Sequence, residues 1–340
     1  AVPAEHTAIL PIRFLSFFST FKMREIGSYS VSGNFSYTPN KIDKYKGVFQ
    51  AGYDENGNWK SNIGDVASSS SAVDPIIEGN MKKEFYLRSP YKGSGKGYDV
   101  DGVAGGPADG MIRTELDMAW LKAMIAEGYT FMPNKTVDKS KIWYGDYIYA
   151  DVNGDGIYGG TDDREFQNVS ADPKFNFGFQ MSAAWRGFDI SMNWAGAAGF
   201  KLYWGPTFGH NSLAANVGYS LGKDVADNRY FYNPDDPSDP RTNINSKYGR
   251  LVTTASGNQN AEGTSLYLYN ANYLKLKNLT FGYTVPVSVS KKVFIENLRV
   301  YISIENVFNI TKYPGQDPEL GATPQYTSLR QFAFGANISF

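Results

Sequence analysis

Residues 175–194 read FNFGFQMSAAWRGFDISMNW and contain two alternating runs joined by a turn. Apolar side chains occupy every odd position of 175–185 and every even position of 188–194. Successive side chains of a strand point to opposite faces, so each run predicts a strand with one apolar and one polar face. Arg186-Gly187 predicts the tight turn between them.

The same alternation recurs in other parts of the chain. It predicts strands over 297–309 and 329–340 near the C-terminus and over 29–37 near the N-terminus. The hairpin that begins at 175 is therefore part of a repeated pattern, which indicates an all-β fold.

One predicted strand, 266–285, changes phase along its length. Its Leu279 and Phe281 share the parity of Lys275 and Lys277, whereas Leu274 and Leu276 have the opposite parity. A β-bulge near Lys277-Asn278 would restore the phase by adding one residue to the strand, and a misplaced strand boundary is the alternative.

The residues on the two faces favour lipid as the neighbour of the apolar side. The polar positions are mostly Ser, Asn, Gln and Gly, whereas a water-facing soluble sheet usually carries more Lys and Glu. The apolar positions are rich in aromatic rings, and runs of ~10 residues match the length of a strand that crosses a bilayer at a tilt. We therefore predict a portion of an antiparallel transmembrane β-barrel. The polar positions that would form its inner wall include Asn176, Gln180, Ser182, Ser191, Asn193, Arg299, Ser303 and Glu305.

The connection lengths agree with a barrel. Outer-membrane barrels have short turns at one rim and long loops at the other, and the C-terminus lies on the short-turn side. Counting back from the last strand, long outer loops at 310–328 and from near Gly205 alternate with shorter inner connections at Arg186-Gly187 and around Pro286.

Composition excludes several classes of protein. The 340 residues carry 33 Lys and Arg against 34 Asp and Glu, and this balance gives no basic surface for nucleic acid. With no cysteine and only His6 and His210, disulfides, thiolate metal sites and histidine catalysis are not expected. No apolar run approaches the ~20 residues of a membrane helix. The N-terminus lacks the pattern of a signal peptide, so we expect a mature or internal fragment.

Residues 45–140 predict a long outer-loop region, and 141–340 predict barrel strands with their loops. The loop region contains Gly, Ser and Pro clusters and one short helix, expected from 115 to 127. Thr114 and Asp117 predict a capping box, and Gly128 predicts the helix end. The apolar stripe of this helix is predicted at Leu116, Trp120, Ala123 and Met124.

The sequence DVNGDGI at 151–157 reproduces the start of an EF-hand-type calcium loop, with oxygen ligands at alternate positions and a glycine at the sharp bend. A metal-free turn of Asp, Asn and Gly is the alternative. The flanking segment 143–149 predicts a strand rather than an EF-hand helix. The expected ligands of a structural calcium ion are Asp151, Asn153, Asp155, Ile157, Asp162 and Asp163.

Several motifs resemble the C-terminal barrel of the SusC/RagA group of TonB-dependent outer-membrane transporters of Bacteroidetes. They are NYLKLKNLTFGY at 272–283, LRVY at 298–301, ENVFN at 305–309 and the Asp317-Pro318-Glu319 triplet. The calcium-like loop is also similar, although two glycines and Tyr158 stand where the family more often has acidic residues.

The resemblance implies import of oligosaccharides or peptides across the outer membrane, with energy relayed through TonB. It further implies a SusD-like surface lipoprotein over the barrel mouth, membrane lipid around the wall, and no enzymatic activity. A plugged transporter has about 22 strands. We find no plug domain or TonB box, so we expect this chain to be the C-terminal part of a longer protein.

Two other interpretations fit the pattern. One is an independent small outer-membrane barrel that acts as a porin or adhesin. The other is a soluble extracellular β-sandwich that binds glycans, in which a second sheet covers the same apolar faces.

Overall fold

The computed structural model describes residues 13–23, 27–98, 105–132, 135–204, 223–251, 263–322 and 326–340. The chain divides into two compact units. The sheet unit comprises the described residues up to Lys41, together with Ser170–Leu202 and Asn270–Phe340. The second unit comprises the described residues of Ile42–Val169 and Tyr203–Tyr269.

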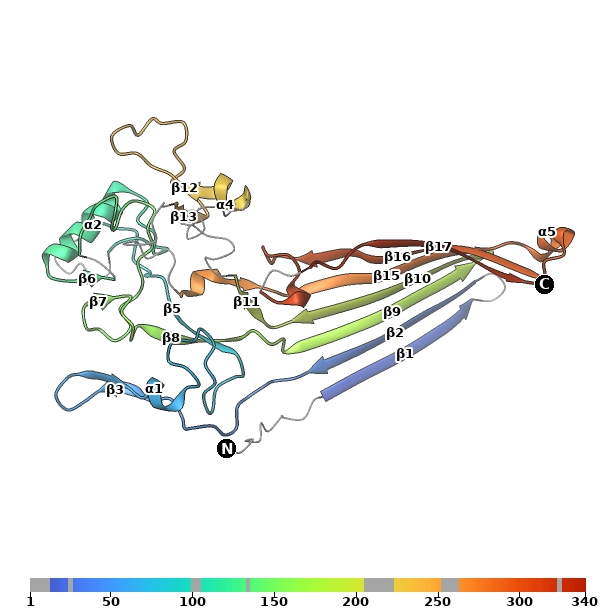
Figure 1. Cartoon of the computed structure of the whole chain (residues 1–340), viewed down its shortest axis with the longest axis horizontal. Helices are drawn as coiled ribbons and strands as arrows, with labels where there is room; N and C mark the ends of the chain where they lie inside the picture. Colours follow the sequence, from blue (N-terminus) through green and yellow to red (C-terminus); the bar gives the residue numbers. More distant parts are fainter. Residues whose placement is uncertain are drawn as a thin grey trace. The chain divides into compact units, whose positions relative to one another are not determined.

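The sheet unit consists of one seven-stranded antiparallel sheet (Figure 1). Its strands follow one another across the sheet in the order in which they occur in the chain. The strands are β1 Arg13–Met23, β2 Gly27–Tyr37, β9 Phe175–Trp185, β10 Phe188–Ala198, β15 Tyr273–Thr284, β16 Asn297–Thr311 and β17 Gln331–Ser339. The strands predicted from the alternation are thus present in this sheet, and β1 is an additional strand that the alternation did not predict.

The register aligns the apolar positions of neighbouring strands into rows on one face. Ile302 of β16 lies opposite Phe281 of β15 on one side and Phe334 of β17 on the other. Exposed fractions of 46% for Phe281, 43% for Val300 and 80% for Phe334 mean that no second sheet in the described part of the chain covers this face. A sandwich requires such a cover, so the described residues contradict that interpretation.

The phase change in the predicted strand 266–285 is a β-bulge. Leu276 pairs with Phe308 and Asn278 with Glu305, and the register also shifts against β10 at the same level. Lys277 is the extra residue on β15 relative to β10. The bulge therefore places the leucines on both sides of it on the same face, as predicted.

Connections of different length alternate between the two ends of the sheet. Arg186-Gly187 joins β9 to β10, with φ angles of 48° and 89°, a left-handed conformation that suits a two-residue hairpin turn. At the same end, α5 Val287–Ser290 and η4 Lys291–Val293 join β15 to β16. Longer connections join β10 to β15 and β16 to β17 at the opposite end, and the latter contains η5 Pro318–Leu320.

The second unit contains short elements around its own core. They are β3 Ala51–Tyr53, β4 Trp59–Ser61, α1 Ile63–Val66, β5 Glu84–Arg88, α2 Glu115–Ala126, β6 Thr130–Phe131, β7 Ile157–Tyr158, α4 Lys223–Asn228, β12 Arg229–Tyr230, β13 Tyr248–Arg250 and η3 Ser265–Tyr267. Three further strands contain the sequence boundaries between the units: β8 Arg164–Ser170, β11 Lys201–Tyr203 and β14 Leu268–Asn270. Among the described residues, no helix combines the length and hydrophobicity of a membrane span.

The predicted helix is present as α2, with small differences. Thr114 and Asp117 form the reciprocal capping box, and Gly128 follows the end with a φ of 103°. Trp120 and Met124 are fully buried, but Leu116 is 49% exposed and Met118 and Leu121 are buried instead. The prediction for Leu116 is wrong because the buried face is rotated toward Met118 and Leu121.

The segment 143–149 is not the strand that the sequence predicts. Tyr147 and Tyr149 form only isolated bridges, with Met111 and Pro90 respectively. Both tyrosines and Ile148 belong to the hydrophobic core that surrounds Trp120. These three consecutive residues are all buried because they pack into this core. The compact unit continues past residue 140 to Val169.

Candidate functional site

The polar face of the sheet carries a row of hydroxyl groups that crosses five strands. The register aligns Ser30, Ser182, Ser191, Thr280 and Ser303 side by side. The Ser30 and Ser182 hydroxyls are 2.7 Å apart, and those of Thr280 and Ser303 are 3.1 Å apart. The predicted wall residues therefore share one face, and most of it is neutral and able to form hydrogen bonds.

One ion pair bridges over β15 on this face. Arg299 Nε donates to Asp189 Oδ2 at 2.9 Å, and its Nη2 donates to Oδ1 at 2.6 Å. Asp189 of β10 pairs with Gly282 of β15, and Arg299 of β16 pairs with Thr284, two residues further along β15. A Cβ atom at Gly282 would lie 2.5 Å from both side chains, so the absence of a side chain here allows the guanidinium to reach the carboxylate.

A buried charge cluster lies at the long-connection end of the sheet. The Lys275 ammonium, whose side chain is 4% exposed, donates to Asp317 Oδ2 at 2.8 Å and to Glu319 Oε2 at 3.1 Å. Lys277 donates to Glu319 Oε2 at 2.6 Å. Two carboxylates thus compensate a lysine that is almost completely removed from water.

These contacts place the segment around η5 against the polar face. Lys275 pairs with Asn309 and Ala195, which have the parity of the polar positions. The Asn309 amide also donates to Asp317 Oδ1 at 3.4 Å, and Pro318 is buried. The segment with Asp317 and Glu319 therefore folds back over the polar face at this end of the sheet.

The predicted calcium loop forms a compact turn whose carboxylates accept backbone hydrogen bonds. Asp151 accepts from the N–H groups of Gly154, Asp155 and Gly156 at 2.6–3.2 Å. Asp155 Oδ1 accepts from the Ile157 N–H at 2.8 Å, and Asn153 Nδ2 donates to Asp155 Oδ2 at 3.1 Å. Side-chain oxygen atoms of Asp151, Asn153 and Asp155 therefore stabilise the turn directly.

The two predicted closing residues differ in environment. Asp163 is buried and accepts from the N–H groups of Val152 and Gly160, each at 2.7 Å, whereas Asp162 is exposed. Burial raises the pKa of Asp163, and these hydrogen bonds act in the opposite direction. In the described ranges, no three acidic or histidine side chains converge on a point where they could hold a metal ion. Calcium binding at Asp151–Asp163 stays a prediction.

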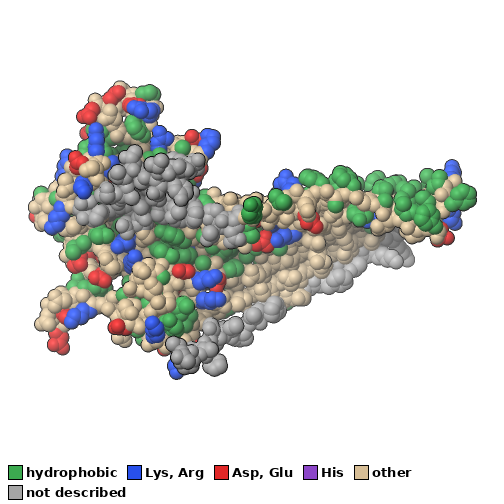
Figure 2. Space-filling model, in the orientation of Figure 1, with side chains coloured by type: hydrophobic (Ala, Val, Ile, Leu, Met, Phe, Trp, Pro, Cys, Tyr) green, Lys and Arg blue, Asp and Glu red, His purple; other side chains and the backbone are tan. Residues whose placement is uncertain are grey.

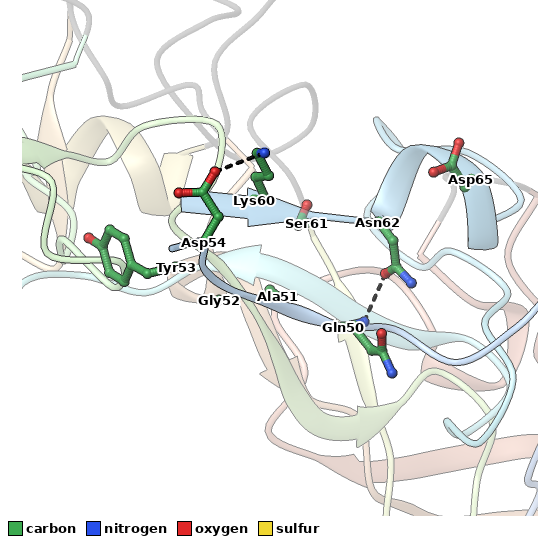
Figure 3. A pocket seen from close by; sticks show the side chains of 9 residues that line it. All are labelled: Gln50, Ala51, Gly52, Tyr53, Asp54, Lys60, Ser61, Asn62 and Asp65. Atoms are coloured by element: carbon green, nitrogen blue, oxygen red, sulfur yellow. Dashed lines mark hydrogen bonds and ion pairs between the residues drawn. The ribbon is translucent and has the colours of Figure 1, made fainter. Parts of the chain in front are cut away.

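A pocket of about 430 Å³ lies at the β3–β4 hairpin of the second unit (Figure 3). Lys60 forms an ion pair with Asp54 at 2.8 Å, which lowers the pKa of Asp54, and Asn62 accepts from the Gln50 N–H at 2.8 Å. The pocket is wide and polar, so it offers hydrogen-bonding groups without an enclosed apolar surface. Its lining consists of Gln50, Ala51, Gly52, Tyr53, Asp54, Lys60, Ser61, Asn62 and Asp65.

The sequence did not predict the partners in the two ion-paired clusters. Lys275 and Asp317 are 42 residues apart, and Asp189 and Arg299 are 110 residues apart. Two features of the sequence pointed to these clusters: the unusual lysines on an alternating strand, and a glycine, Gly282, inside that strand. Neither signal identifies a partner before the strand register is known.

No protein-family model matches the chain. In sequence, the chain is 26% identical over 211 residues to TonB-dependent receptor P3 of Formosa agariphila and 30% identical over 209 residues to TonB-dependent receptor P39 of the same organism. Each alignment covers 58% of this chain and 19% of the relative. The chain thus spans about a fifth of the length of these curated relatives.

Two solved structures share the fold. The RagAB peptide transporter matches with a TM-score of 0.60 and 19% identity, over 96% of this chain and 29% of that chain. The RagAB peptide importer in its 'closed-closed' state matches with a TM-score of 0.57 and 20% identity, over 96% and 29%. The predicted resemblance to SusC/RagA-type TonB-dependent transporters and the predicted β-barrel fold class are therefore confirmed.

Proposed function

We propose that this chain is the C-terminal barrel part of a TonB-dependent transporter that imports oligosaccharides or peptides across the outer membrane. The apolar face of the sheet contacts lipid, and the hydroxyl-rich face lines the passage. The short-turn end faces the periplasm and the long connections face outward, where a SusD-like surface lipoprotein covers the mouth. The chain has no catalytic role in this proposal.

The observation that carries the proposal is the contrast between the two faces of one sheet. Phe281 and Phe334 lie in an uncovered apolar row, while Ser191, Thr280 and Ser303 lie in a polar row directly behind it. Exposing such an apolar surface to water is unfavourable by about 25 cal/mol per Å². A sheet with this pattern is stable when lipid contacts one face and water or polar groups contact the other.

The polar face supports an elongated, neutral or mixed-charge substrate. Its hydroxyl and amide groups can donate and accept hydrogen bonds, and its Asp189 and Arg299 side chains form an ion pair in which the charges compensate each other. Both peptides and oligosaccharides present hydroxyl or amide groups along their length. The sequence relatives and the shared fold support an importer without deciding between these two classes.

The test is energy-dependent uptake by cells that express the full-length protein. Fluorescent peptide and oligosaccharide pools are supplied to cells with the gene intact, with the gene deleted, and with TonB disrupted. We expect uptake of one pool to require both the gene and TonB. Uptake that needs the gene but not TonB would indicate an independent porin and contradict the proposal.

The lipoprotein lid is tested separately by affinity purification of the full-length protein from outer membranes. We expect a SusD-like lipoprotein to copurify in stoichiometric amount. Absence of such a partner, together with TonB-dependent uptake, would remove the lid from the proposal and leave import in place.

A further inference from the structure

The connection between β15 and β16 exposes an unusual number of apolar side chains. Val287, Val289, Val293 and Phe294 are 51%, 53%, 62% and 89% exposed. These residues lie within α5, η4 and the position directly after η4. Short turns in water are normally polar, so this apolar cluster requires an explanation.

Phe294 also has a backbone conformation that is unfavourable for its residue type. Its φ of 63° is left-handed, and it ends η4 at a position where glycine or asparagine is usual. Left-handed residues with a large side chain are uncommon, and they persist where other interactions compensate. The ring is the most exposed of the cluster, so within the described residues it gains little packing in return.

Two positive charges accompany the apolar cluster. Lys291 and Lys292 are exposed, and neither takes part in the ion pairs formed within the described part of the chain. Glu296 is the acidic residue nearest in sequence. A short segment with valines, a phenylalanine and two lysines has the composition of a surface that lies at the boundary of an anionic bilayer.

The cluster adjoins the apolar face at the short-turn end of the sheet. The Glu296 N–H donates to the Ser339 carbonyl at 2.8 Å, which joins the end of the connection to β17. Apolar-face residues at this end, Phe188, Ile338 and Phe340, are 45%, 49% and 85% exposed. Hydrophobic side chains gather at the end of the sheet that carries α5 (Figure 2).

We infer that the connection 286–296 is a membrane-interface anchor that binds the anionic headgroup region of the periplasmic leaflet. Phe294 and the three valines enter the boundary between headgroups and acyl chains, and Lys291 and Lys292 bind lipid phosphates. This inference rests on the proposed barrel, whose lipid-facing surface the anchor extends beyond the strand ends. Its partner is the bilayer, rather than a periplasmic protein.

Collision measurements on spin-labelled full-length protein test the anchor. The 340 residues contain no cysteine, so each single substitution introduces a unique label site within them. The variants V289C and F294C are compared with V48C, whose valine in the second unit is similarly exposed, at 50%. The variant I302C marks the apolar face of the sheet. The protein is reconstituted in vesicles of phosphatidylethanolamine and phosphatidylglycerol.

Oxygen concentrates in lipid, whereas a neutral nickel complex stays in water, so the ratio of their collision rates reports the depth of each label. We expect V289C and F294C to give a ratio several-fold above that of V48C and below that of I302C. Labels at V289C and F294C that match V48C, or that are shielded from both reagents, would overturn the anchor. The barrel proposal would survive that outcome if I302C still lies in lipid, and it would fail if I302C lies in water.

The charge contribution is tested with the double variant K291Q/K292Q combined with F294C. With both lysines present, replacing phosphatidylglycerol by phosphatidylcholine should decrease the collision ratio at residue 294. In the double variant we expect this dependence on anionic lipid to disappear. Equal ratios in the two lipids with both lysines present would overturn the assignment of phosphate binding.

Discussion

At the scale of single residues, the close approach of neighbouring side chains explains two glycine positions on the polar face. Gly282 leaves room for the contact between Arg299 and Asp189, and a Cβ atom at Gly335 would lie 2.4 Å from the Tyr301 ring. At both positions, side chains from neighbouring strands occupy the space where the side chain of a larger residue would lie. Glycine normally weakens a strand, so its presence here reflects the packing of larger groups around it.

We expect G282A to break the Arg299–Asp189 ion pair because the added methyl group would overlap both side chains. Overpacking of this kind costs about 1–3 kcal/mol. The midpoint of heat-induced loss of the folded gel band of the full-length protein measures the effect. G52A is the matched control, since no atom lies within 4 Å of a Cβ atom at Gly52. Equal midpoints for G282A and G52A would contradict the role of the glycine.

We expect K275M to release the segment around η5 from the polar face. Removing one partner from a buried ion pair costs about 3–5 kcal/mol because a charge remains uncompensated. K277M is the matched control, since its side chain is 35% exposed and the expected cost is about 0–1 kcal/mol. Hydrogen exchange of Glu319 and Leu320 amides measures the release. Unchanged protection in K275M would show that other contacts hold the segment, whereas partial recovery in K275M/D317N/E319Q would support the charge explanation.

The buried Asp163 predicts a pH dependence of the 151–163 loop. Burial raises the pKa of Asp163 in the folded state above 3.8, its value in the open loop. At pH values between 3.8 and the raised pKa, the folded loop therefore binds more protons than the open loop. The free energy of opening should therefore decrease as pH rises through this window. Hydrogen exchange of the Val152 and Gly160 amides, corrected for the intrinsic pH effect, measures it. D163N should remove the dependence.

Hydrogen exchange of the same amides also tests whether the 151–163 loop binds calcium. If the loop binds the ion, millimolar calcium should increase protection at neutral pH in the unmodified protein and have a smaller effect in D151N. Protection that is insensitive to calcium would leave the loop as a metal-free turn.

At the scale of secondary-structure elements, the strand faces are the main determinant of the fold. The bulge at Lys277 shows how the chain keeps its apolar face continuous when the alternation changes phase. Without the extra residue, Leu274 and Leu276 would point to the polar face. The alternating residues and the bulge together produce one apolar surface from strands whose sequences are individually imperfect.

We expect I302R to prevent assembly in the outer membrane, and S303R to be tolerated. The Ile302 side chain lies in the apolar row, where an arginine at the bilayer midplane costs about 2–4 kcal/mol, whereas Ser303 lies in the hydroxyl row. Heat-modifiable gel mobility and the amount of full-length protein in outer membranes measure assembly. If both variants assemble equally, the assignment of the two faces is wrong.

The sequence predicts much of the sheet and little of its contacts. Alternation identifies β9 and β10, and the capping residues Thr114 and Asp117 identify the start of α2, because these signals are local. β1 escaped prediction because phenylalanine occurs at both parities of its sequence, as at Phe17 and Phe18. The ion pair of Lys275 with Asp317 depends on the path of the β16–β17 connection, which no local pattern encodes.

At the scale of the whole molecule, the sheet has two strands with one neighbour each. Among the described strands, β1 pairs only with β2, and β17 pairs only with β16. Unpaired strand edges are unfavourable in lipid because their N–H and C=O groups have no water to bind. Further strands are therefore expected to pair with these edges in the proposed transporter.

We expect the 340 residues, expressed alone with an added signal peptide, to be degraded or to aggregate in the periplasm. The full-length protein should instead give a heat-modifiable band in outer membranes. Gel mobility before and after heating measures both. A heat-modifiable band from the 340 residues alone would favour an independent small barrel and contradict the fragment interpretation.

The row of hydroxyls from Ser30 to Ser303 has a consequence for how a molecule would move past the wall. Neighbouring strands are about 4.8 Å apart, so a group that leaves one hydroxyl meets another within the same distance. Because the row runs across the strands, exchange of partners in such short steps would turn a bound molecule around the wall without a deep energy minimum. In the proposed transporter, such a row would let cargo rotate and would bind cargoes with different side groups alike, so discrimination would have to occur before entry, at the mouth.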